Sequence, residues 1–205
     1  MASDGDDETD EWYERKSKWM AKRLGREHDM VMHAIIPYAL GGGLDLYYYP
    51  NGIKGTGIAT KELCEVKDEG PKNKCFDNYE LVMFTRHKLD LDDAKDDDTK
   101  FGKAHSKINA FLNCLAPYAA EATLNPNETC EFPKGMETVG GKCLIFDGYP
   151  DYDSDYVDEF GLLVAIQIFR AETEFARERG GGKLLKRLKA DGYYPYSDMD
   201  RDPVV

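Results

Sequence analysis

The sequence predicts a single α+β domain with a mixed, mostly antiparallel sheet flanked by helices. Apolar runs of strand length and segments with helical spacing follow one another without the regular strand–helix alternation of a parallel βαβ fold. No segment of about 20 to 50 residues recurs, which excludes a repeat architecture. The 205 residues are 41% hydrophobic and 12% aromatic. That supply is enough for one core of ordinary size.

The first expected element is a helix over residues 10–24 that ends at Gly25. Its large side chains fall at helical spacing, with basic residues between them; they are Trp12, Tyr13, Trp19, Met20 and Leu24. Residues 1–28 are therefore read as an acidic N-terminal extension with a helix, and residues 29–205 as the domain proper.

Four strands are expected to follow. Residues 30–36 are nearly all apolar, as in a strand covered on both faces. Residues 44–49 alternate apolar and polar side chains and end at a Pro-Asn-Gly turn signal. Residues 58–63 and 79–84 are two further candidates.

A long helix is expected in the middle of the chain, over residues 101–115. It carries one apolar stripe, and Asp98 or Thr99 is placed to cap its exposed amides. Pro117 is expected to end or kink the helix near Ala116.

The last third of the chain predicts two strands and then two helical segments. The strands are residues 142–148 and 160–169, the second of them central in the sheet. The helical segments are residues 171–179, which have acids early, and residues 183–189, which have bases late; each pattern suits the helix dipole. Three consecutive glycines, residues 180–182, separate them.

The charge balance narrows the possible partners. The chain has 39 acidic and 27 basic residues, a formal charge of −12, and a sequence pI near 4.8. An acidic chain repels phosphate backbones and anionic membrane surfaces, so neither nucleic acid nor membrane is expected as a partner. Composition leaves the oligomeric state open.

The expected compartment is the cytoplasm. No basic residue precedes Arg15, so no secretory leader is expected, and the longest apolar run, residues 161–169, is too short for a membrane span. The cysteines, odd in number and widely spaced, are expected to be buried or half-buried thiols; they are Cys64, Cys75, Cys114, Cys130 and Cys143.

Motifs for metals, phosphates and catalysis are incomplete. Asp151, Asp153 and Asp155 match the alternating aspartates at the start of an EF-hand calcium loop. Tyr156 and Leu162, however, occupy the positions where that loop needs Gly and Glu. The glycines before Lys183 lack the upstream Gly and the following Ser or Thr of a phosphate loop. Cys114 with His105 is a weak candidate for a nucleophile and base. We expect no cofactor, no metal and no enzyme.

A surplus of tyrosine and aspartate near residue 150 is the feature that points to a function. Carboxylates attract a basic partner by long-range field, and tyrosine rings then pack against it. We therefore expect a protein partner with a basic surface. The candidate contact residues are Tyr149, Asp151, Tyr152, Asp153, Asp155 and Tyr156.

The C-terminal third, residues 160–205, resembles the end of the suppressor of fused domain family. In that family a strand leads into a helix pair with the pattern E-F/Y…G…LL…L…G and closes on D-x-x-R. The matching positions are Glu174, Phe175, Gly180, Leu184, Leu185, Leu188, Gly192, Asp198 or Asp200, and Arg201. Weaker matches in the same order extend the resemblance to roughly residues 29–205.

The resemblance implies a non-catalytic α+β domain that binds a partner. The founding member of the family restrains a transcription factor by binding a peptide of it, and single-domain bacterial relatives look like immunity proteins that neutralise a toxin. An immunity-type inhibitor is therefore the first expectation. The alternatives are a regulatory module for an endogenous transcription factor and a hydrolase that uses a carboxylate pair.

Overall fold

A mixed sheet organises the chain, of which the computed structural model describes residues 4–152 and 156–205. In these residues the strand order is β1-β2-β3-β4-β7-β6-β5, antiparallel throughout except for the parallel pair β4–β7. The strands are β1 Val31–Met32, β2 Leu46–Tyr49, β3 Thr56–Ala59, β4 Tyr79–Thr85, β5 Thr129–Glu131, β6 Cys143–Tyr149 and β7 Gly161–Ile168. The predicted α+β class with one domain and a mostly antiparallel sheet is confirmed.

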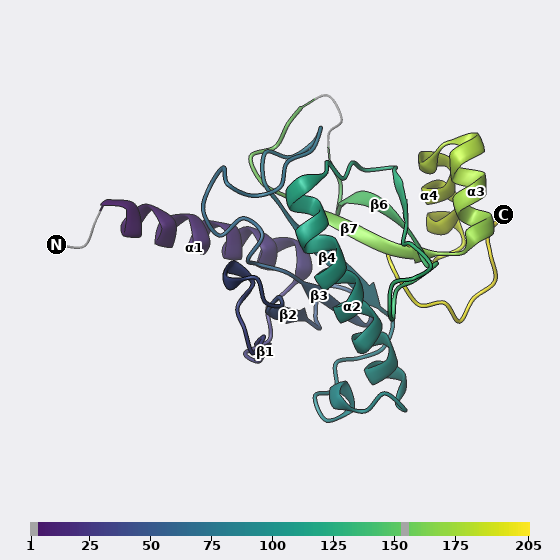
Figure 1. The fold of residues 1–205 in the computed structure, drawn as a ribbon, viewed down its shortest axis with the longest axis horizontal. Coiled ribbons are helices and arrows are strands. Elements are labelled where there is room, and N and C mark those ends of the chain that lie inside the picture. The colour runs from purple at the N-terminus through teal and green to yellow at the C-terminus, as the bar shows by residue number, and fades with distance from the viewer. Residues whose placement is uncertain (1–3, 153–155) are drawn as a thin grey trace.

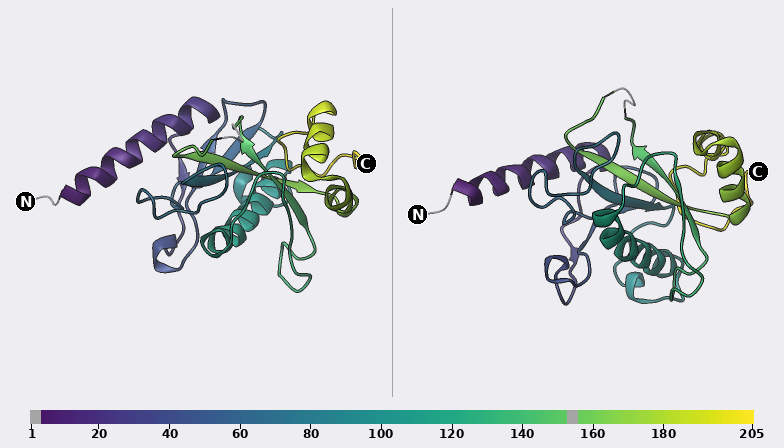
Figure 2. Two further views of the ribbon diagram at one scale, coloured as in Figure 1. Left: turned by 90° about the horizontal axis from the view of Figure 1, so that it is seen from above. Right: turned by 45° about the horizontal axis from the view of Figure 1, so that its top comes forward.

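Helices cover both faces of this sheet. They are α1 Asp4–Leu24, α2 Lys100–Glu121, α3 Arg170–Arg179 and α4 Gly181–Ala190. Figure 2 shows α1 and α2 on opposite sides of the sheet. In Figure 1 the first half of α1 extends away from the sheet, and α3 and α4 lie beside the C-terminus at the other end of the molecule.

The alternation of side chains along β4 and β7 divides the core into two layers. Leu81 and Leu163 face α2, whereas Val82 and Val164 face the other side. The α2 layer adds Ile108, Phe111, Leu112 and Leu115. The opposite layer adds Trp12, Met20 and Leu24 from α1 and Leu184, Leu185 and Leu188 from α4. Every residue of β7 is buried, as expected for a strand covered on both faces.

A buried ion pair fixes α1 to the sheet. The Lys16 ammonium donates to Glu80 Oε1 on β4 at 3.0 Å, and neither side chain is exposed. It also donates to the carbonyls of Lys61 (2.7 Å) and Cys64 (2.9 Å), so all three of its protons are used. Helix α1 is thus bound to the domain by a polar network as well as by apolar contacts.

The C-terminal segment closes a gap between the two central strands. Strands β4 and β7 pair from Tyr79–Gly161 to Val82–Val164, and beyond that point Ser197 lies between them. Its backbone N–H donates to the Phe84 carbonyl at 2.8 Å. Its hydroxyl donates to the Ala165 carbonyl and accepts the Gln167 N–H, both at 3.2 Å.

The prediction of a covered strand over residues 30–36 is wrong. Only Val31–Met32 pair with β2, at the edge of the sheet, and both are half-buried. The chain then turns into a loop closed by the hydrogen bond from Gly43 N–H to the Ile36 carbonyl at 3.0 Å. The Ile35 side chain in this loop is fully exposed. The apolar composition of residues 30–36 predicted burial. Among the described strands, however, β1 lies at the edge of the sheet and has a neighbour on one side only, so these residues are not covered.

Two other element boundaries differ from prediction. The strand expected at residues 58–63 is Thr56–Ala59, because residues 60–64 turn away to surround Glu80. Helix α2 continues through Pro117 to Glu121, and Ala119 in this last turn is buried in the core. Thr99, the second of the two expected caps, accepts the Gly102 N–H at 3.0 Å.

Candidate protein-binding surface

The predicted contact residues lie on the connection between β6 and β7, which we call the β6–β7 loop (residues 149–160). Tyr149 is the last residue of β6, and Asp151 and Tyr152 follow it. Tyr156 lies on the return of the loop toward β7. Asp153 and Asp155 lie outside the described residues.

Two of the three tyrosines serve mainly to hold the loop. The Tyr149 ring packs 4.8 Å from the Phe84 ring, and burial raises the pKa of its hydroxyl. The Tyr152 ring lies edge-on to Phe76 at 6.3 Å, and its hydroxyl accepts a hydrogen bond from the Asn127 amide at 3.0 Å. Because Tyr149 packs with the α1 layer and Tyr152 with the α2 layer, they fix the loop from opposite faces of the sheet.

The accessible part of the described loop includes both apolar and acidic side chains. The Tyr156 side chain is 70% exposed, its neighbour Val157 is 53% exposed, and Asp151 is exposed. The loop backbone beneath them is tethered, since Asp158 N–H donates to the Cys75 carbonyl at 2.8 Å. An exposed ring beside an apolar side chain on a fixed backbone is suited to packing against another protein.

Two hollows flank the loop, and Asp151 lines both. The first, of about 310 Å³, lies between the loop and α4 and includes Asp147 and Lys189. The second, of about 210 Å³, lies against α1 and includes Trp19 and Arg23, whose guanidinium group is 4.0 Å from the Trp19 ring. A partner could therefore contact the exposed side chains of the loop and also insert side chains into the two hollows beside it.

Some of the local acids are already neutralised by the protein's own cations. Asp147 pairs with Lys189 at 3.1 Å. Glu159 pairs with Lys67 at 2.8 Å and Arg15 at 3.0 Å, and the hydrogen bond from Lys67 contributes most to lowering its pKa. Among the described loop residues, Asp151 and Asp158 are exposed and have no ion pair, so they supply the free negative charge.

The catalytic candidates are not assembled into a site within the described residues. His105 lies at 2.9 Å from the Tyr48 hydroxyl, and burial lowers its pKa. Cys114 lies farther along the same helix, where burial raises the pKa of its thiol. A search of the described residues finds no group of three side chains suited to a metal ion.

The residues that carry the family resemblance have structural roles. Asp198 accepts the Thr85 hydroxyl at 2.6 Å and the Arg86 N–H at 2.7 Å, both at the end of β4. Arg201 makes two hydrogen bonds to Glu172 on α3, at 2.6 and 2.8 Å, in a fully buried pair. Of the two aspartates that fit the pattern, Asp198 thus makes the closing contact.

One surface was missed by the sequence reasoning. Lys100, Lys103 and Lys107 line a cavity between α2 and the C-terminal segment. Their spacing of three and four residues is the helical spacing that places side chains on one face, so the signal is present in the sequence. It was overlooked because residues 101–115 were searched for their apolar stripe alone.

The described layers and strand order define a class of α+β domain in which a mixed sheet lies between helices. The particular fold is that of Suppressor of fused. A chain of the Sufu–Fu complex matches with a TM-score of 0.60 and 15% identity, over 96% of this chain and 92% of that chain. A putative SUFU homolog from Neisseria gonorrhoeae FA 1090 matches with a TM-score of 0.59 and 11% identity, over 95% and 98%.

Drosophila Suppressor of fused matches with a TM-score of 0.55 and 16% identity, over 86% of this chain and 47% of that longer chain. No family model matches the sequence, and no curated protein matches it. The TM-scores and the coverage establish the fold, which confirms the resemblance found in the sequence. No helix within residues 4–152 and 156–205 is long and apolar enough to cross a membrane.

Proposed function

We propose that this chain is a non-catalytic binding domain that covers the active surface of a partner protein, and that the partner is a toxin. The observation that carries the proposal is the nearly complete mutual coverage with a chain of the Sufu–Fu complex, a structure of one protein bound to another. Similar coverage of the N. gonorrhoeae homolog supports a bacterial single-domain setting. Within the chain we take residues 29–205 as the domain proper.

The proposed contact surface is the β6–β7 loop. Asp151 and Asp158 attract a basic partner, and Tyr156 with Val157 packs against it once water is displaced. Tyr149 and Tyr152 hold the first residues of the loop, 149–152, against the domain, which lowers the entropic cost of ordering that part on binding. We propose the cytoplasm as the compartment, because all five cysteines are free thiols.

The first test is capture of the partner by the full chain. The purified protein is immobilised, native lysate of its own cell is passed over it, and retained proteins are identified by mass spectrometry. We expect one basic protein in near-equal amount, lost from the double variant Asp151→Asn/Tyr156→Ala. The matched control, Asp191→Asn/Tyr118→Ala, changes an exposed acid and an exposed tyrosine elsewhere and retains the partner.

The identity of the captured protein separates the alternatives. If the captured protein stops the growth of cells that make it, and co-expression of this chain restores their growth, an immunity function is supported. Recovery of a DNA-binding regulator instead overturns the immunity function in favour of a regulatory module. Equal retention by both double variants contradicts the β6–β7 loop as the contact surface. Retention of no protein, together with turnover in a hydrolase screen that Asp147→Asn abolishes, contradicts the binding proposal, since Asp147 and Asp151 line one hollow.

A further inference from the structure

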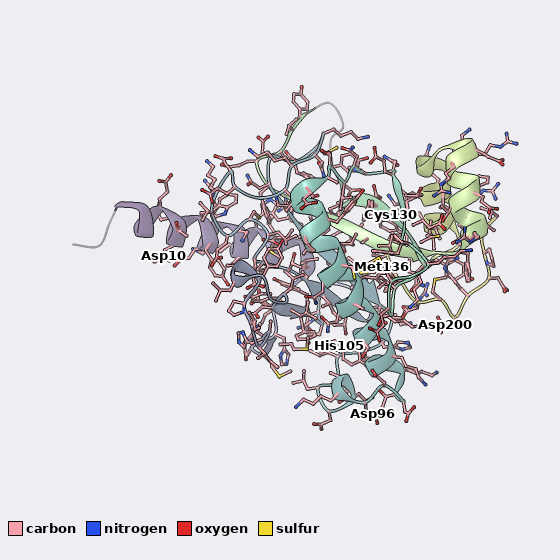
Figure 3. The ribbon with its side chains drawn as sticks, viewed as in Figure 1. Asp10, Asp96, His105, Cys130, Met136 and Asp200 are labelled. Carbon is pink, nitrogen blue, oxygen red and sulfur yellow. The ribbon has the colours of Figure 1, made fainter. Side chains whose placement is uncertain are left out.

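A second recessed surface, which we call the lysine groove, lies far along the sheet from the β6–β7 loop. It is a cavity of about 380 Å³ between α2 and the C-terminal segment. One wall is the lysine face of α2, Lys100, Lys103 and Lys107, and the other includes Asp198 and Asp200. In Figure 3 the labelled Asp200 lies beside the half of α2 that carries the labelled His105.

The three lysines form a positive stripe in an acidic protein. In the described part of the chain none of them forms an ion pair; the Lys103 ammonium donates to the Asp98 carbonyl at 3.2 Å. Elsewhere in the described chain Lys16, Lys18, Lys61, Lys67 and Lys189 each hold a carboxylate, whereas single exposed lysines such as Lys22 and Lys183 do not. The grouping of three unpaired lysines on one wall of a cavity sets Lys100, Lys103 and Lys107 apart. A chain with 39 acidic residues that leaves three neighbouring ammonium groups unpaired has them available for an external anion.

The position of the lysines on α2 also works against the helix itself. Lys100 is the first residue of α2, and the first turn contains no acidic residue. The N-terminal end of a helix carries partial positive charge, so cations there are unfavourable. Lys100 therefore has no favourable interaction with the helix dipole, which is compatible with a role in binding.

The floor of the groove carries an independent sign of a ligand. Gln167, near the end of β7, is 7% exposed and lines the groove. Its backbone N–H is bonded to Ser197, but its side-chain amide has no hydrogen bond to any described residue. The amide is accessible from the groove and offers both a donor and an acceptor to a bound molecule.

The opposite wall carries two carboxylates, Asp198 and Asp200, which restrict an anion to the lysine side of the groove. Both Asp198 oxygens are engaged, by the Thr85 hydroxyl and the Arg86 N–H, and His87 Nε2 lies 3.7 Å from Asp198 Oδ1. Asp200 is exposed at the rim. Lys142 lies close enough to Lys107 for their charges to interact: burial and then the charge of Lys107 lower the pKa of Lys142.

We propose that the lysine groove binds an acidic peptide segment, rich in Asp and Glu, of a partner protein. Its carboxylates would pair with Lys100, Lys103 and Lys107, and the Gln167 amide would hydrogen bond to it at the floor. A short peptide is favoured over a nucleic acid because the overall charge of −12 opposes every polyanion, and a continuous phosphate backbone carries more negative charge than a few carboxylates. This site differs in place and in charge from the β6–β7 loop, so the inference goes beyond the proposed function.

The test is an NMR titration of the ¹⁵N-labelled full chain with a short capped peptide of Glu residues around one Phe. A peptide of the same length with Lys in place of Glu is the control probe. We expect saturable shifts at Lys100, Lys103, Lys107 and Gln167 with the acidic peptide only, weakened by added salt. Lys103→Glu/Lys107→Glu is expected to weaken binding by roughly tenfold, through two lost ion pairs and new repulsion.

The matched variant Lys22→Glu/Lys183→Glu makes the same change in net charge at two exposed positions on α1 and α4. It is expected to bind the acidic peptide as the parent does. Equal weakening by both double variants, absence of shifts, or shifts outside the groove overturns the proposal. Tighter binding of a single-stranded oligonucleotide at the same residues overturns it in favour of a nucleic-acid site. The capture experiment depends on other residues, so the two proposals fail separately.

Discussion

Charged residues that are fully buried stand out at the scale of single side chains. Lys16–Glu80 joins α1 to β4, and Arg201–Glu172 joins the C-terminal segment to α3. In both pairs further hydrogen bonds satisfy the carboxylate: Cys64 N–H at 3.2 Å and the Thr60 hydroxyl at 2.7 Å reach Glu80. Such pairs contribute little net stability when complete but are costly to break, because one charge is left without a partner.

Replacement of Lys16 by Met tests this cost. The variant leaves the Glu80 carboxylate buried without its cation, so the free energy of unfolding should fall by about 3–5 kcal/mol. Lys16→Met/Glu80→Gln removes both charges and should be less destabilised than the single variant. Urea denaturation measures both, with Lys18→Met at the exposed Glu14–Lys18 pair as the control, where little change is expected. A double variant with a lower free energy of unfolding than Lys16→Met would contradict this account.

The sequence did not reveal these buried charges. Lys16 sits among Arg15, Lys18 and other bases of α1, and only its three-dimensional partners distinguish it. For the β6–β7 loop, composition identified the exposed Tyr156 and Asp151. It could not show that Tyr149 and Tyr152 are packed against the core, because burial of loop residues depends on neighbours distant in sequence.

At the scale of elements, periodicity predicted most of the structure. Helices α1 to α4 and strands β2, β4, β6 and β7 were predicted within a few residues of their bounds. The exceptions are the start of α1, at Asp4, and the end of α2, at Glu121. β5, with only three residues, was missed, and the strand at residues 30–36 was wrong. Short strands at a sheet edge depend on pairing more than on their own composition.

The proline inside helix α2, Pro117, is expected to lower the stability of the domain. Pro117 lies inside α2, is exposed, and has no N–H to donate to the carbonyl four residues earlier. Pro117→Ala restores that hydrogen bond at a site where little packing is lost, so we expect the free energy of unfolding to rise by about 1–3 kcal/mol. A higher urea midpoint with an unchanged slope would support this expectation. A lower midpoint would mean that the ring itself supports the last turn.

At the scale of the whole molecule, buried tyrosines make stability depend on alkaline pH. Burial raises the pKa of Tyr48 to about 12. Burial also raises the pKa values of Tyr49 and Tyr79, and the Tyr49 hydroxyl additionally donates to Glu27 at 2.7 Å. The pKa of Lys16 is raised as well, because the charge of Glu80 and its other neighbours outweigh the opposing effect of burial.

These shifts fix the sign of the pH dependence. The folded state holds its protons more tightly than the unfolded chain, whose tyrosines ionise near pH 10. Stability is therefore complete below about pH 9 and declines as the pH rises from about 10 to 12. Urea denaturation at several pH values, combined with tyrosinate absorbance, checks this. A free energy of unfolding that stays constant over that interval would contradict it.

The parallel pair β4–β7 has a consequence for how the chain reaches its native state. Strands β1 to β4 and strands β5 to β7 form two antiparallel halves, and the parallel joint between them spans only four residue pairs. Neighbouring strands within a half find each other quickly, whereas the joint requires segments far apart in sequence to meet. Until they meet, β4 and β7 expose apolar edges to other molecules. The yield of native protein on refolding is therefore limited by competition between this joining step and aggregation, and dilution favours the joining step.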